Sequence, residues 1–187
     1  LYLSPDLTLY DYHNGVMDLT NKSIKFIGDA QTRIKEDYLR IIRYFRFKAT
    51  YGIEFDESHI EEKEYLKIIS KEKSNLEILS FDRIMSEMQK IFNLNECVNI
   101  LFVMQETGVF DYITSGLLID IGMLKMAIGN NIQMDWKMKI AVLLYKNKEV
   151  GAMWPNAVKS MINFYHQHIK SDVIDVLCKG VGARISI

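Results

Sequence analysis

The spacing of hydrophobic positions changes once along the chain, near Gly28. Before it, apolar residues form the short β-prone runs Leu1–Leu3 and Leu7–Tyr10, separated by the turn-forming sequence Ser-Pro-Asp. A third run, Ile24–Ile27, predicts one more strand. A few unpartnered strands have no core of their own, so the opening predicts the edge of a larger sheet.

After Gly28 the apolar spacing becomes helical, and Asp29 is a suitable N-cap. An apolar stripe then runs along one side of a helix that is predicted to end near Gly52. The stripe consists of Ile34, Tyr38, Ile41, Ile42, Phe45 and Ala49. The pattern therefore predicts a single helix over residues 29–52.

Helical patterns continue to the end of the chain. Ser58 and Glu61 have the spacing of a capping box and predict the start of a second helix. Further helices are predicted at about residues 80–92, 97–106, 117–128, 135–145, 155–168 and 171–179. The predicted fold class is mainly α, a helical array preceded by a short β segment.

Composition adds little to this picture. Apolar residues make up 49% of the 187 residues and charged residues 25%, as in soluble globular proteins. No apolar run is long enough to span a bilayer, and no secretory signal opens the chain. Cys97 and Cys178 lie in apolar helical patterns, which predicts buried thiols in a reducing, cytoplasmic setting.

Arginine is concentrated in one short stretch. The chain has 23 basic residues, of which six are Arg, and four of these six fall between Arg33 and Arg46. On the predicted helix, Glu36, Asp37 and Arg40 gather opposite the apolar stripe, together with Arg43. Periodicity alone favours a solvated face of ion pairs at i,i+3 and i,i+4 spacing.

The same cluster has a chemical interpretation. A fixed carboxylate beside a fixed guanidinium accepts from the amino group of cytosine or adenine and donates to the neighbouring ring nitrogen. Uracil and guanine present a carbonyl oxygen to that carboxylate and are rejected. Tyr38, Tyr44, Phe45 and Phe47 flank the cluster; Phe45 is predicted to be core, and the role of Tyr44 stays open.

Residues 28–47 read GDAQTRIKEDYLRIIRYFRF. This segment resembles the Gly-Asp-Pro…Arg…Glu-Asp-x-Leu-Arg-x-x-Arg-x-x-Arg-Phe signature of class II tRNA nucleotidyltransferases and bacterial poly(A) polymerases. Upstream, residues 11–19 (DYHNGVMDL) are similar to the family's Asp-x-x-Gly-Gly-x-x-Asp-Leu segment, with Asn14 in place of a Gly. Downstream, residues 80–90 (SFDRIMSEMQK) resemble a Ser-x-Glu-Arg-Ile-x-x-Glu-Leu-x-Lys helix of the family, with Asp82 in place of Glu. Residues 104–109 (MQETGV) are similar to its Met-x-x-x-Gly-Val turn.

The resemblance implies the nucleotide-binding residues. Glu36, Asp37 and Arg40 would read the base of CTP or ATP, while Arg43 and Arg46 would contact the nucleotide or shape its pocket. Support is expected from Arg33, Asp11, Gly15 and Arg83. Residues 1–28 would be the end of the head domain, 29–93 the neck, and 94–187 a helical body that supports the pocket and the tRNA 3′ end.

The resemblance also implies what the sequence lacks. Family members hold Mg²⁺ on an Asp-x-Asp pair that follows a Gly-rich loop in the head, and neither motif occurs here. We therefore expect no catalytic and no metal-binding residues in these 187 residues, and a fragment that is inactive alone and lacks the tail domain. A separate chain could carry the head. A poly(A) polymerase fragment and an inert helical RNA-binding module stay open as alternatives.

Overall fold

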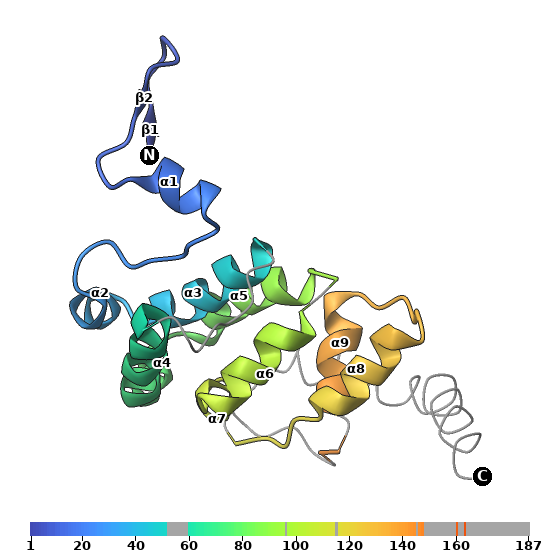
Figure 1. The fold of residues 1–187 in the computed structure, drawn as a ribbon. Coiled ribbons are helices and arrows are strands. Elements are labelled where there is room, and N and C mark those ends of the chain that lie inside the picture. Colours follow the sequence, from blue (N-terminus) through green and yellow to red (C-terminus); the bar gives the residue numbers. More distant parts are fainter. Residues whose placement is uncertain are drawn as a thin grey trace.

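The computed structural model describes residues 1–51, 60–95, 97–114, 116–144, 146–147, 160 and 163. The chain opens with a small hairpin of β1 (Tyr2–Leu3) and β2 (Leu9–Tyr10), which pair antiparallel with Tyr2 opposite Tyr10. The hairpin and the short helix α1 (Gly15–Thr20) project from the helical array (Figure 1). The first two predicted strands are thus confirmed.

The predicted strand at residues 24–27 is wrong, because this segment pairs with no strand in the described part of the chain. Ile24 and Phe26 instead pack their side chains against the helical core. The apolar alternation that suggested a strand therefore serves contacts with helices.

The predicted helix over residues 29–52 is two helices, α2 (Ala30–Glu36) and α3 (Leu39–Thr50). Asp29 caps α2 as predicted, and its carboxylate accepts from the Thr32 amide at 2.7 Å. Asp37 has extended backbone angles, with φ −157° and ψ 106°, and its carboxylate accepts from the Leu39 amide. An Asp that caps the next helix in this way competes with continuation of the preceding one.

The remaining helices closely follow the ranges predicted from the spacing of apolar residues, apart from two short ones. They are α4 (Ile60–Glu72), η1 (Lys73–Ile78, a 3₁₀ helix), α5 (Phe81–Phe92), α6 (Val98–Glu106), α7 (Val109–Ile113), α8 (Ile121–Gly129) and α9 (Trp136–Leu143). Asp120 and Asp135 cap α8 and α9 by accepting from the amides of Met123 and Met138. The mainly α fold class is confirmed, whereas η1 and α7 were not predicted.

One core joins the helices. It is built from side chains of less than 2% exposure: Phe45, Ile34, Ile41, Ile42, Ile69, Leu76, Met88, Ile91, Leu101, Met104, Leu124 and Leu144. α3 packs most extensively against α5, and Figure 1 shows these two helices side by side. Lys139 of α9 donates from a buried position to the carbonyl oxygens of Phe92 and Leu94, at 2.7 and 2.9 Å, and so closes the end of α5.

The core bears out several residue-level predictions. Phe45 and Cys97 are both fully buried. Predictions at Gly52, Ser58, Tyr145 and Cys178, and the helix at 171–179, lie outside the described residues. So does the helix at 155–168, except for Ser160 and Asn163. Within the described ranges, no helix has the length and apolar composition that crossing a membrane requires.

Candidate functional site

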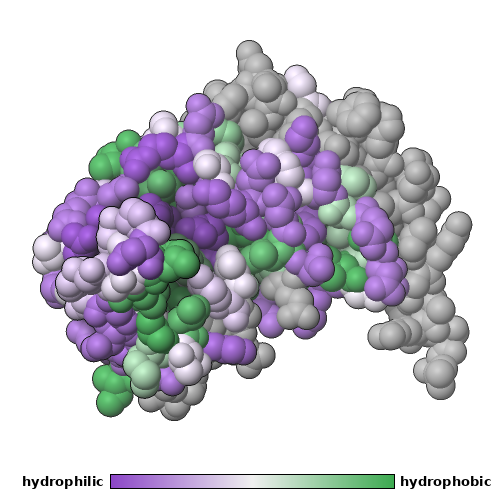
Figure 2. All heavy atoms as spheres, turned by 90° about the horizontal axis from the view of Figure 1, so that it is seen from above, coloured by the Kyte–Doolittle hydropathy of each residue, from purple (hydrophilic) through white to green (hydrophobic). Residues whose placement is uncertain are grey.

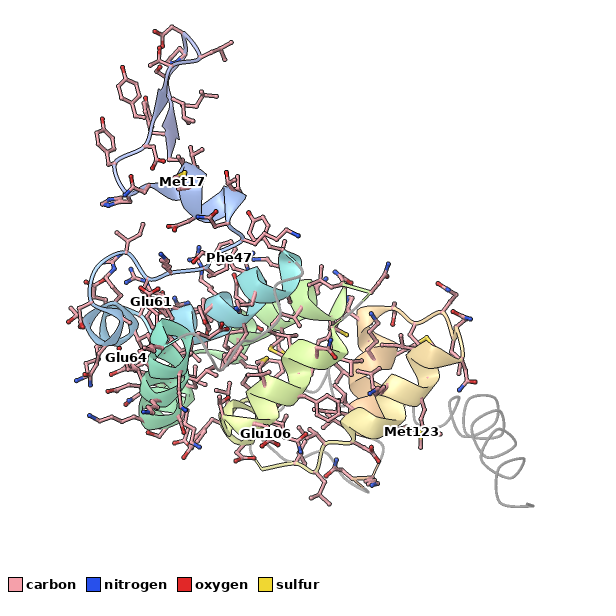
Figure 3. All side chains as sticks on the ribbon, in the orientation of Figure 1. Met17, Phe47, Glu61, Glu64, Glu106 and Met123 are labelled. Atoms are coloured by element: carbon pink, nitrogen blue, oxygen red, sulfur yellow. The ribbon has the colours of Figure 1, made fainter. Side chains whose placement is uncertain are left out.

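A hollow of about 290 Å³ lies between the extended segment 24–27 and the helices α2 and α3. It is lined by Ile24, Lys25, Phe26, Ile27, Arg33, Arg40, Arg43, Tyr44 and Phe47. Figure 3 shows Phe47 on the side of α3 that faces the connection from α1. The hollow thus brings three of the four clustered guanidiniums together with three aromatic rings.

Two of these guanidiniums share one carboxylate. Glu36 accepts from Arg33 at 2.5 Å and from Arg40 at 2.6 Å, and Arg40 also donates to the Arg33 carbonyl oxygen at 2.8 Å. The hydrogen bond from Arg40 lowers the pKa of the Glu36 carboxyl, so this group is ionised at neutral pH. The predicted i,i+4 pair therefore exists, and it orients Arg40 at the edge of the hollow.

Arg43 differs from its two neighbours. Its side chain is exposed, and it makes no hydrogen bond or ion pair with any other residue that the structure describes. Lys25 adds a fourth cation, whose ammonium lies 3.5 Å from Asp18 and 3.9 Å from Glu61. The hollow consequently has an excess of positive charge that suits an anionic ligand.

Asp37 does not line the hollow, and the prediction that it shares one helical face with Glu36, Arg40 and Arg43 is wrong. The helix breaks at this residue, and Arg83 of α5 donates to both carboxylate oxygens of Asp37, at 3.1 and 2.9 Å. Arg83, predicted only as support, is thus the direct partner of a predicted base-reading residue.

Arg46 also lies outside the lining of the hollow. Its Nε donates to Glu87 of α5 at 2.5 Å, and its guanidinium lies 4.0 Å from the centre of the Phe47 ring. Burial by itself raises the pKa of Glu87, but hydrogen bonds from Lys90 and Arg46 outweigh burial and lower it. Arg46 therefore contacts the hollow only through Phe47.

The sequence indicated only part of the aromatic lining of the hollow, namely Tyr44 and Phe47 but not Phe26. Tyr44 is 4% exposed, and burial raises the pKa of its hydroxyl, which stays neutral. The alternation of Tyr44 and Phe47 with Arg residues was a usable signal for these two. Nothing in the sequence marked Lys25 or Phe26, because only the fold brings their segment beside α3.

The two other predicted supporting residues act at α1. The Asp11 carboxylate accepts from the amides of Gly15 and Val16, at 2.7 and 2.9 Å, and these bonds lower the pKa of Asp11. Asn14 adopts a left-handed conformation with φ 55°, which Asn tolerates, so its replacement of a Gly fits this turn. Neither Asp11 nor Gly15 lines the hollow.

A bound metal ion needs several carboxylate, imidazole or thiolate side chains gathered in one place. No group of three or more His, Cys, Asp or Glu side chains in the described part of the chain is placed to hold a metal ion.

A hollow lined by guanidiniums and aromatic rings has the chemistry that suits an anionic ligand with a flat ring. Residues 61–118 match the family model described as "Probable RNA and SrmB-binding site of polymerase A". In sequence the chain is similar to CCA-adding tRNA nucleotidyltransferases and to the poly(A) polymerase family model, as its motifs indicated.

Curated relatives agree with this family. The chain is 40% identical over 113 residues to the human protein named CCA tRNA nucleotidyltransferase 1, mitochondrial. This match covers 60% of this chain and 25% of the human protein. It is 34% identical over 105 residues to the CCA-adding enzyme of Staphylococcus epidermidis, covering 56% of this chain and 25% of that enzyme. The chain is 25% identical over 169 residues to the CCA-adding enzyme of Staphylococcus haemolyticus. This match covers 88% of this chain and 40% of that enzyme. The chain thus spans well under half the length of these relatives.

Proposed function

We propose that this chain binds a nucleoside triphosphate in the hollow, as the nucleotide-selecting part of a tRNA nucleotidyltransferase that adds CCA to tRNA 3′ ends. The observation that carries the proposal is the convergence of Arg33, Arg40 and Arg43 on a space lined by aromatic rings. Guanidiniums suit phosphate oxygens because of their planar, multiple donors. Aromatic rings suit the flat face of a base.

The three arginines are prepared for the ligand to different degrees. Glu36 already orients Arg33 and Arg40, so binding loses less side-chain entropy at these two residues. Arg43 has no partner among the described residues and is free to meet the phosphates directly. We therefore assign Arg43 to the triphosphate.

Base reading is proposed to centre on Arg40. Both hydrogen bonds of this side chain use Nη1, so within the described residues its Nε and Nη2 groups remain available as donors. The ring nitrogen of cytosine or adenine would accept from one of them. The amino group of the base would then donate to Glu36, or to Asp37 after Asp37 exchanges its contact with Arg83.

The proposed substrates are CTP and ATP, and the proposed acceptor is the 3′ end of tRNA, in the cytoplasm. Transfer itself is proposed to need Mg²⁺ on carboxylates of a catalytic head, whether in the same or in a separate chain. We expect the 187 residues alone to add no nucleotide, because they contain no Asp-x-Asp pair. Incubation with Mg²⁺, labelled CTP or ATP and tRNA lacking CCA tests this, and extension above background would contradict it.

The binding proposal is tested by calorimetric titration of the chain with CTP, ATP, UTP and GTP. We expect CTP and ATP to bind more tightly than UTP and GTP, because only their bases match a carboxylate beside a guanidinium. Inorganic triphosphate serves as the control for the phosphate contribution. Absence of binding by all four nucleotides would overturn the proposal, and equal binding would leave a phosphate site without base selection. A poly(A)-adding enzyme would bind ATP and discriminate against CTP.

A second candidate function is RNA binding without nucleotide selection, favoured by the match of residues 61–118 to an RNA-binding family model. Titration with tRNA separates the two functions. Binding of tRNA with no binding of any nucleotide would favour this second reading.

A further inference from the structure

Phe26 lies between two buried tyrosines from different helices. Its ring stacks on Tyr44 of α3, with centroids 5.4 Å apart and planes 20° apart. It meets the edge of Tyr65 of α4 at 5.1 Å and 80°, and Tyr44 and Tyr65 contact each other at 5.8 Å. These separations are in the range that aromatic pairs favour.

The segment that carries Phe26 has few other attachments. In the described chain, residues 24–27 take part in no backbone–backbone hydrogen bond and in no strand. The Lys25 ammonium lies 3.5 Å from Asp18 and 3.9 Å from Glu61, and its side chain is 41% exposed, so these ion pairs are weak. Ile27 is 58% exposed. The ring of Phe26 and the side chain of Ile24, which both pack against the helical core, are consequently the main tertiary contacts of this segment.

The segment nevertheless lines one side of the hollow with all four of its residues. We propose that Phe26 is a positioning residue of the nucleotide site: the packing of its ring against both Tyr44 and Tyr65 holds residues 24–27 against α3 and so keeps the hollow closed on that side. This inference rests on the proposed function for its ligand. Through Tyr65 it also ties the hollow to α4, within the region that matches the RNA-binding family model.

The experiment compares the 187-residue wild type with three variants. Phe26→Ala removes the ring, Phe26→Tyr retains it, and Phe102→Ala removes an exposed ring from α6, remote in sequence from the hollow. Two quantities are measured for each: affinity for CTP and ATP by calorimetry, and the rate of trypsin cleavage after Lys25, identified by mass. Thermal unfolding followed by circular dichroism identifies the temperature at which every variant is folded.

We expect Phe26→Ala to bind the nucleotides roughly tenfold more weakly, because two ring contacts are lost. The same variant should be cleaved after Lys25 several times faster. Phe26→Tyr and Phe102→Ala should match the wild type in both measurements. Nucleotide affinity of Phe26→Ala within twofold of the wild type would overturn the inference, as would an equal loss in Phe102→Ala.

The two proposals fail in different ways. If the wild type binds no nucleotide, the proposed function fails, and cleavage after Lys25 then decides whether Phe26 holds the segment. Cleavage that is no faster in Phe26→Ala than in the wild type would show that other contacts fix residues 24–27. The inference would then be wrong whatever the ligand.

Discussion

Arg83 of α5 donates to both carboxylate oxygens of Asp37, the residue at which α2 has ended and α3 has not begun. The two side chains are 49% and 29% exposed, so the pair contributes little to stability by itself, about 0.2–1 kcal/mol. The Asp37–Arg83 pair instead determines where the Asp37 carboxylate points. The carboxylate also accepts from the Leu39 amide, and the two contacts together fix its direction at the start of α3.

Substitution of Asp37 by Ala should reduce the preference for CTP and ATP over UTP and GTP. Loss of a charge-assisted hydrogen bond to the base corresponds to about 1.5–3 kcal/mol, or roughly ten- to a hundredfold in discrimination. Calorimetric titration with all four nucleotides measures it. Glu64→Ala, an exposed carboxylate on α4 that Figure 3 labels, is the matched control. Unchanged discrimination in Asp37→Ala would assign Asp37 to the helix break alone.

Substitution of Arg43 by Ala should weaken triphosphate binding without loss of stability. The guanidinium is exposed and unpaired among the described residues, so its removal should change the free energy of unfolding by less than about 0.5 kcal/mol. Nucleotide affinity should fall about tenfold or more. Titration and urea unfolding on the same samples check both values. Lys67→Ala removes an exposed cation from α4 and should leave the affinity unchanged.

Substitution of Glu87 by Gln should destabilise the fold in a pH-dependent way. Arg46 and Glu87 are 15% and 10% exposed, and removing the charge of one leaves the other poorly compensated, at a cost of about 1–3 kcal/mol at pH 7. The pKa of Glu87 is lower in the folded chain than in the unfolded one. The stabilisation is therefore complete above the unfolded value of about 4.3 and is lost as pH falls through the folded value.

Urea unfolding at pH values from about 3 to about 8, a range that brackets the titration of carboxyl groups, measures the free energy of unfolding of the wild type and of Glu87→Gln. The wild type and Glu87→Gln should differ most at neutral pH and converge in acid. Glu77→Gln, on the exposed side of η1, should follow the wild type throughout. A constant difference across the range would show that packing, not the ion pair, sets the effect.

The hairpin should cause the chain to associate. Leu1, Leu3, Leu7 and Leu9 are between 51% and 77% exposed, and Figure 2 shows hydrophobic spheres gathered on this side of the molecule. Exposed apolar groups on a strand edge favour self-association. Light scattering should show a mass that rises with concentration. The double variant Leu3→Lys and Leu9→Lys should suppress the rise, whereas Ile78→Lys, at an isolated exposed site, should not.

The sequence by itself determined the helices and their buried sides. A stripe such as Ile41, Ile42 and Phe45 can be buried only on one side of a helix, and the capping residue Asp29 acts within three residues of its position. Local spacing also indicated the arginine cluster and the Glu36–Arg40 pair, since both depend on residues only a few positions apart in the sequence.

Tertiary structure decided the shape of the site. Asp37 meets Arg83, 46 residues away, and Arg46 meets Glu87, 41 residues away. Periodicity describes only neighbours within a turn or two, so it predicted one continuous helix and one polar face where the fold has a break and two ion pairs. The wall at residues 24–27 depends on Phe26 finding a place between Tyr44 and Tyr65, which exists only once α3 and α4 have packed together.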